Sequence, residues 1–69
     1  MRTNSGYRLI RRVRGRWEPI KIHGDYNHLV QLRAELVARD VERGQRVLQI
    51  TDKCITLTGC AYIITEVDN

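Results

Sequence analysis

Four residues of this 69-residue chain are of the types that bind zinc: His23, His28, Cys54 and Cys60. Structural zinc sites usually bring their cysteines in tight pairs. Here five residues separate the two cysteines and four separate the two histidines, which does not match that spacing. Both cysteines also lie in apolar, β-rich sequence, where a free cysteine packs as a small core residue. The sequence therefore predicts no metal site, no cofactor and, in a reducing compartment, no disulfide.

Residues that could catalyse a reaction are sparse. A nucleophile needs a base held within reach, and no familiar nucleophile motif is present. Asp40 and Glu42 are two residues apart at the predicted end of a helix, so they point in different directions. The five glycines are scattered singly, so no glycine-rich phosphate loop is present. We expect the protein not to be an enzyme and to have no catalytic residues.

Positive charge is concentrated in the first third of the chain. Residues 1–23 contain seven basic side chains and one acid, Glu18, for a net charge of +6, whereas residues 24–69 carry −2. This uneven distribution suggests a directed electrostatic field. The alternative is a solvated, arginine-rich strand that only keeps the protein in solution.

The basic stretch "GYRLIRRVRGRWEPIKI", residues 6–22, has the pattern of a β-hairpin. Residues 7–13 and 17–22 are rich in strand formers and flank Arg14-Gly15, a candidate turn. A two-residue turn places these pairs opposite each other, with the apolar residues on one face: Leu9 and Ile20, Tyr7 and Ile22, Arg11 and Glu18.

The other face of this predicted hairpin carries the residues of interest: Arg8, Arg12, Trp17 and Lys21, with Ile10 and Pro19 between them. A three-residue turn would shift the register by one and move every side chain of one strand to the opposite face. Pro19 has no N–H to donate, so its strand should lie at a sheet edge or carry a bulge.

A helix is predicted in "HGDYNHLVQLRAELVARDVERG", residues 23–44. Asp25 or Asn27 can cap its N-terminus, and Gly44 can supply the left-handed residue that ends it. Arg33 falls near the centre of the apolar arc, two turns before Asp40. Such an arginine usually snorkels at the packing boundary; alternatively, the two residues belong to a polar contact within the fold or across a dimer.

Three further strands are predicted at about residues 45–51, 54–58 and 61–67, although Gly59 could instead mark a bulge within one longer strand. The expected fold is α+β, a single domain over residues 1–69 in the order ββαβββ, with residues 1–5 frayed. One helix packs on one face of an antiparallel sheet and leaves the other uncovered. The expected core is Leu9, Ile20, Ile22, Leu29, Leu36, Val37, Leu48, Ile50, Ile55, Leu57 and Ile63.

The basic hairpin predicts a non-enzymatic module that binds nucleic acid, either DNA or RNA. Arginine contacts phosphate in bidentate fashion, and an exposed tryptophan stacks on a base. We expect phosphate contacts from Arg8, Arg12, Arg14, Arg16 and Lys21, with Trp17 as the stacking residue. The alternative is a small regulator or inhibitor of phage or mobile-element type, whose hairpin or edge strand binds an acidic protein surface or a second copy as a homodimer.

Composition adds broad limits. The chain is 42% hydrophobic and 29% charged, which is typical of a globular domain. Its longest apolar run, which contains Ala61–Ile64, is far too short for a membrane span or a signal peptide. We therefore expect a cytoplasmic protein, and the preference for arginine over lysine suggests a bacterial or phage gene.

Overall fold

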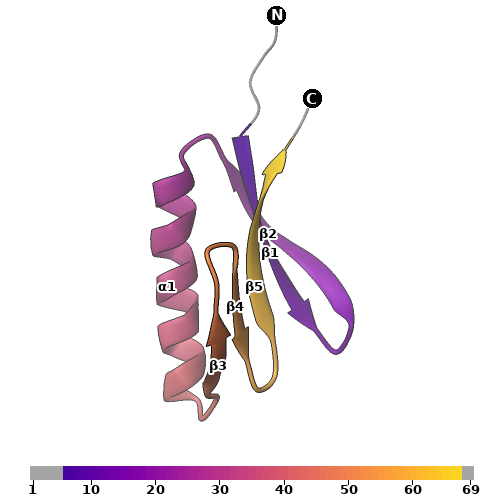
Figure 1. Ribbon diagram of the computed structural model, residues 1–69, viewed down its shortest axis with the longest axis vertical. Helices are drawn as coiled ribbons and strands as arrows, with labels where there is room; N and C mark the ends of the chain where they lie inside the picture. The colour runs from indigo at the N-terminus through magenta and orange to yellow at the C-terminus, as the bar shows by residue number, and fades with distance from the viewer. Residues whose placement is uncertain (1–5, 68–69) are drawn as a thin grey trace, which may run out of the picture.

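The computed structural model describes residues 6–67, and its elements follow the order ββαβββ (Figure 1). The predicted α+β fold is confirmed, while the prediction that residues 1–5 are frayed lies outside the described residues. The elements are β1 (Gly6–Val13), β2 (Arg16–His23), α1 (Tyr26–Glu42), β3 (Val47–Ile50), β4 (Cys54–Leu57) and β5 (Ala61–Val67).

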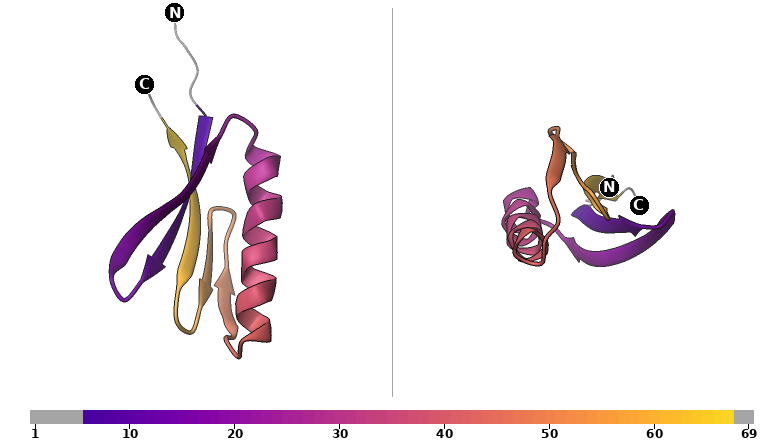
Figure 2. Two further views of the ribbon diagram at one scale, coloured as in Figure 1. Left: turned by 180° about the vertical axis from the view of Figure 1, so that it is seen from behind. Right: turned by 90° about the horizontal axis from the view of Figure 1, so that it is seen from below.

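The five strands form one antiparallel sheet in the order β2-β1-β5-β4-β3, with β2 and β3 at its edges. Helix α1 packs on one face of this twisted sheet (Figure 2). The first and last strands, β1 and β5, are neighbours, so sheet pairing joins the two ends of the chain. The meander after the helix has a turn at Gly59, so residues 54–67 form two strands.

The turn of the β1–β2 hairpin has two residues, as predicted. Arg14 and Gly15 both have positive φ, 54° and 81°, the left-handed conformation that matches a two-residue turn to the twist of its strands. Val13 pairs with Arg16, and Arg11 pairs with Glu18. The register nearest the turn is therefore confirmed.

Beyond Glu18 the register changes at a bulge. Ile10 pairs with Pro19, but the next residue of β1, Leu9, pairs with Lys21, which leaves Ile20 as an extra residue on β2. Pro19 lacks an N–H group, and a bulge accommodates the interrupted ladder. The prediction that this strand lies at an edge or carries a bulge is confirmed, because both features are present.

This bulge corrects the other half of the predicted register. Leu9 does not oppose Ile20, and Tyr7 pairs with His23 instead of Ile22. Because one extra residue moves each following side chain to the opposite face, Ile22 leaves the predicted core face and is 59% exposed.

Helix α1 begins and ends at the predicted signals. The Asp25 side chain caps it by accepting a hydrogen bond from Asn27 N at 3.0 Å. Gly44 follows its end with φ of 104° and donates to Val41 O at 3.0 Å. No helix within residues 6–67 has both the length and the apolar character needed to cross a bilayer.

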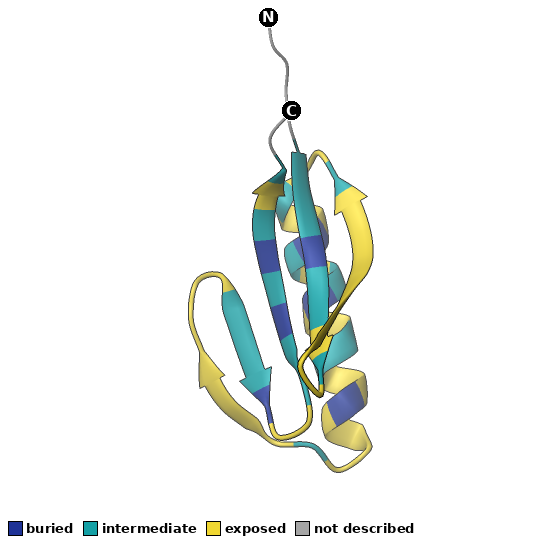
Figure 3. Ribbon diagram, turned by 90° about the vertical axis from the view of Figure 1, so that its right-hand side faces the viewer, coloured by how far each residue is buried: buried dark blue, intermediate teal, exposed yellow. Residues whose placement is uncertain are grey.

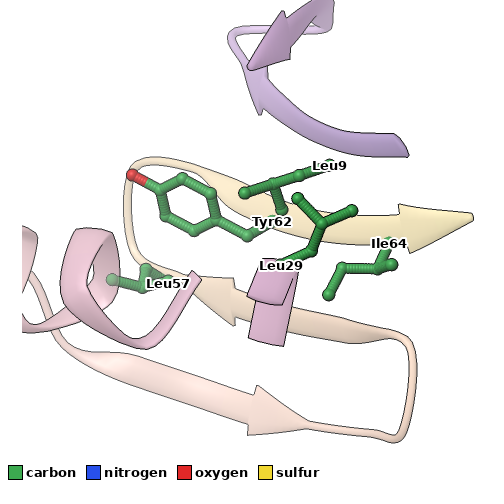
Figure 4. Close-up of a cluster of buried hydrophobic side chains, with 5 residues drawn as sticks. All are labelled: Leu9, Leu29, Leu57, Tyr62 and Ile64. Atoms are coloured by element: carbon green, nitrogen blue, oxygen red, sulfur yellow. The ribbon is translucent and has the colours of Figure 1, made fainter. Parts of the chain in front are cut away.

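The core lies between α1 and the strands that this helix covers (Figure 4). Its fully or almost fully buried apolar residues are Leu9, Leu29, Leu57, Tyr62 and Ile64. Leu36, Val37 and Ile55 pack around them while half-buried. The predicted core is thus confirmed for the residues of β1, α1 and β4.

Four predicted core residues are wrong, because they belong to edge strands that the helix does not cover (Figure 3): Ile20, Ile22, Leu48 and Ile50. For β5, the predicted core residue, Ile63, lies on the opposite face of the sheet from the core. Ile63 pairs with Ile10 and is half-buried on the uncovered side, whereas its neighbours Tyr62 and Ile64 reach the core.

Arg33 is buried, with 7% of its surface exposed, and its Nη1 donates to Lys53 O at 3.1 Å. Tyr26, at the start of the helix, donates its hydroxyl to Asp52 O at 3.1 Å. These two bonds hold the β3–β4 turn against α1. The expectation that Arg33 snorkels is wrong: it makes a polar contact within the fold, but its partner is this turn and not Asp40.

The fully buried Leu29 should dominate the stability of the helix–sheet packing. Leu29→Ala should lower the free energy of unfolding by roughly 2–5 kcal/mol, the usual range for a leucine truncated in a core. Val41→Ala is the control on the same helix, since Val41 is 45% exposed and its truncation should cost less than about 0.5 kcal/mol. Urea denaturation measures both changes, and equal losses would contradict this placement of the core.

Candidate nucleic-acid interface

The side of the β1–β2 hairpin that faces away from the helix forms one continuous surface. Successive side chains of a strand point to opposite faces. Leu9 is buried in the core, so its neighbours on β1 point outward. Residues directly opposite in the ladder share a face, and the pairs on this side are Arg8 with Ile22, Ile10 with Pro19, and Arg12 with Trp17. We call these six residues the outer hairpin face.

Trp17 is the most prominent aromatic group on the outer hairpin face. The Arg12 guanidinium lies over its ring, 5.5 Å from the ring centroid, within the range of a cation–π interaction. Half of the Trp17 surface is still exposed, at 50%. Beside the ring is a shallow groove of about 340 Å³, lined by Arg8, Ile10, Trp17, Pro19 and Ile22. The indole is thus oriented by one arginine and remains accessible to a ligand.

The arginines differ in how far their charge is neutralised. Arg11 is on the helix side of the sheet, and its Nη2 lies 3.0 Å from Glu18 Oε1 in an ion pair. Within residues 6–67, no ion pair involves the other hairpin arginines, which are Arg8, Arg12, Arg14 and Arg16. Arg14 and Arg16 are exposed at the tip of the hairpin. The structure therefore places Arg8 and Arg12 on the outer hairpin face and Arg14 in the turn beside it, whereas Arg16 pairs with Val13 and points to the helix side at the hairpin tip.

Lys21 does not belong to the outer hairpin face, contrary to the predicted register. It pairs with Leu9, so its side chain is on the helix side of the sheet, and Ile22 takes its place beside Arg8. The exchange makes the face less basic and more apolar than predicted. Pro19 was the one available signal, because a proline inside a strand marks the position where the alternation of faces can break.

The four candidate zinc ligands lie in separate places. The rings of His23 and His28 stack, with centroids 4.0 Å apart and planes 10° apart, and His23 Nδ1 accepts a hydrogen bond from Asp25 N at 2.9 Å. Cys54 in β4 and Cys60 in the turn before β5 are free thiols. Within residues 6–67, no group of three or more histidine, cysteine, aspartate or glutamate side chains is close enough to hold a metal ion.

The remaining polar cluster is centred on the buried carboxylate of Asp40. Tyr62 donates its hydroxyl to Asp40 Oδ2, and Cys60 Sγ donates to the same oxygen at 3.4 Å. Burial, reinforced by the Asp40 hydrogen bond, raises the pKa of Tyr62 to about 12. Burial and then Asp40 also raise the pKa of the Cys60 thiol. Both groups are therefore protonated donors at neutral pH, and a protonated thiol is a poor nucleophile.

The chain was compared with protein-family models, with curated proteins and with solved structures, and none of them matched it. The chemistry of the outer hairpin face is therefore the basis on which a function can be inferred.

A chelator should leave the fold intact, because the two histidines stack on each other and Cys60 bonds to Asp40. We expect the circular dichroism spectrum with excess chelator to match the untreated spectrum. Loss of structure that added zinc restores would contradict this and would require the histidines and cysteines to meet at a metal ion.

Stability should fall at high pH because Tyr62 holds its proton more tightly in the folded state. Its pKa is about 12 when folded and about 10 when unfolded. Its contribution to stability is therefore complete below pH ~10 and is lost as the pH rises towards ~12. The loss should reach roughly 2–3 kcal/mol in all.

The matched control for this pH dependence is Tyr62→Phe, which cannot ionise at this position. Urea denaturation at a series of alkaline pH values should show the wild type losing stability faster than the variant, so that their difference shrinks. Parallel curves would show that the Tyr62 proton is not linked to folding.

Proposed function

We propose that the protein is a non-enzymatic nucleic-acid-binding module that uses the outer hairpin face. The observation that supports this most is the grouping of an exposed Trp17 with four arginines that have no acidic partner within residues 6–67. Arg8 and Arg12 lie on the face itself, and Arg14 and Arg16 extend the positive charge to the hairpin tip.

The chemistry of these groups suits a single strand. A guanidinium forms paired, charge-assisted hydrogen bonds with phosphate oxygens. The indole of Trp17, which Arg12 orients, offers a surface on which an unpaired base can stack, whatever its sequence. The apolar groove beside the ring gives such a base a dry surface to lie against. We therefore place phosphates against the arginines and a base against Trp17.

The charge of the whole chain supports the same target. The net charge is +4, and the hairpin contributes most of the positive excess. A positive surface attracts a polyanion over distance and raises the rate of encounter. Since its target would be intracellular nucleic acid, we place the protein in the cytoplasm.

A second candidate function follows from the apolar centre of the face. Ile22 is 59% exposed and Trp17 is 50% exposed, and they lie beside Arg8, Ile10 and Pro19. Tryptophan and arginine around an apolar centre are typical of protein-interaction hot spots. The rival proposal is therefore a regulator that docks this face on an acidic protein surface.

Titration of labelled single strands and duplexes, both DNA and RNA, tests the first proposal. Binding should weaken steeply with salt, with a log–log slope on the order of −3 to −4 for about four phosphate contacts. Arg12→Ala should reduce the magnitude of that slope by about one and weaken all sequences alike. Trp17→Ala should cost single-strand binding roughly 1–3 kcal/mol.

Two control variants separate a local interface from a general charge effect. Arg39→Ala removes the same charge from the exposed surface of the helix, and Lys21→Ala removes one from the helix side of the hairpin. Both should affect binding less than Arg12→Ala. No binding to any nucleic acid at micromolar protein would reject the proposal and leave the protein-binding function in its place.

A further inference from the structure

The two edges of the sheet are protected to very different degrees. Exposed edge strands invite pairing with other chains, and proteins block them with prolines, charges and bulges. Strand β2 has all three: Pro19, a bulge at Ile20, and the charged residues Arg16 and Lys21. These features disfavour further pairing at this edge.

Strand β3, at the opposite edge, is "VLQI" and contains neither a charge nor a proline. Leu48 is 63% exposed and Ile50 is 68% exposed. A bulge at Leu48, between the Val47 and Gln49 pairs, is its one irregularity. Thr51 donates its N–H to Cys54 O on β4 at 2.8 Å. Since backbone groups alternate in direction along a strand, those of Ile50 point to the open edge.

We propose that β3 is a dimerisation edge, at which two copies of the chain pair antiparallel through their β3 strands. A two-fold axis at Gln49 places Leu48 opposite Ile50 of the second copy, and the reverse contact follows by symmetry. This self-complementary arrangement is the usual geometry of a closed dimer. It buries the two most exposed apolar residues of the strand and joins the sheets into one.

Charge complementarity favours a second copy over an unrelated extended peptide. Arg46 precedes β3 and Asp52 follows it, and both are exposed. In an antiparallel pair centred on Gln49, the end of β3 that Arg46 precedes lies beside the β3–β4 turn of the second copy, which carries Asp52, and this happens at both ends of the interface. Opposite charges that meet at the ends of a ladder favour pairing, whereas like charges oppose it. The strand thus carries at its two ends the charges that its own antiparallel copy requires.

Size gives a further reason for association. A chain of 69 residues buries a smaller share of its surface than a larger domain and gains from association. The proposal does not depend on what the outer hairpin face binds, because that face is formed by β1 and β2 at the other side of the sheet.

Sedimentation over a range of protein concentrations tests the proposal. The wild type should sediment as a dimer at high concentration. Ile50→Lys should be monomeric, since it puts a charge at the centre of the edge without disturbing a buried residue. Ile20→Lys is the matched control: it adds the same charge to an exposed isoleucine of β2 and should remain dimeric. Circular dichroism checks that both variants fold.

A charge exchange tests the register. Arg46→Asp brings acids together at both ends and should raise the dimer dissociation constant at least about tenfold. Combining it with Asp52→Arg restores opposite charges and should recover the wild-type constant. The proposal would be overturned by a wild type that stays monomeric, or by a dimer that is lost in Ile20→Lys but kept in Ile50→Lys. It would also be overturned if the double variant did not recover the wild-type dissociation constant.

Discussion

The hydrogen bonding of the buried Asp40 is the interaction on which the rest of the structure depends. Its Oδ2 accepts hydrogen bonds from Tyr62 of β5 and from Cys60 in the preceding turn. Its backbone oxygen accepts the N–H of Gln45 at 3.1 Å and thereby helps to end the helix. A buried polar group is costly unless it is hydrogen-bonded, and these bonds tie the last turns of α1 to β5 and to the turn before it. One residue thus links the end of the helix to the sheet.

The second constraint is the area of the sheet that one helix can cover. A single helix covers the middle strands of a five-stranded sheet, where Leu9, Tyr62 and Ile64 are buried beneath it. It cannot also cover both edges, so apolar residues of β2 and β3 remain exposed (Figure 3). Large apolar groups left exposed on a small protein usually mark interaction surfaces. The two surfaces proposed to bind partners are the two places that the helix does not reach.

The hairpin shows how one irregular residue changes a surface. Before the bulge, Arg11 and Glu18 neutralise each other on the helix side, and Arg12 and Trp17 pair on the outer side. After the bulge, Ile22 and not Lys21 reaches the outer side. The result is an apolar centre with arginines around it. A regular hairpin would have placed Lys21 opposite Arg8 and would have carried a more evenly basic face.

The features that the sequence determined by itself are those with local causes. Asp25 caps the start of the helix with its side chain, and Gly44 ends it with its left-handed backbone. Arg14-Gly15 forms the turn because both residues adopt positive φ. Pro19 indicates an edge strand and a bulge because it has no backbone N–H to donate. For the same reason the membership of Arg8, Arg12 and Trp17 in one face could be predicted, since all three lie where the register is set by the turn or by alternation along one strand.

Only the tertiary structure decided which faces and edges are covered. The bulge places Ile22 instead of Lys21 on the outer hairpin face. The helix buries Tyr62 and Ile64 and leaves Ile63 on the uncovered side of the sheet. The buried Arg33 donates a hydrogen bond to the β3–β4 turn. Each of these outcomes depends on contacts between residues far apart in the chain. A period-two pattern fits either face equally well until the strand packs against a partner, and here that partner is the single helix α1.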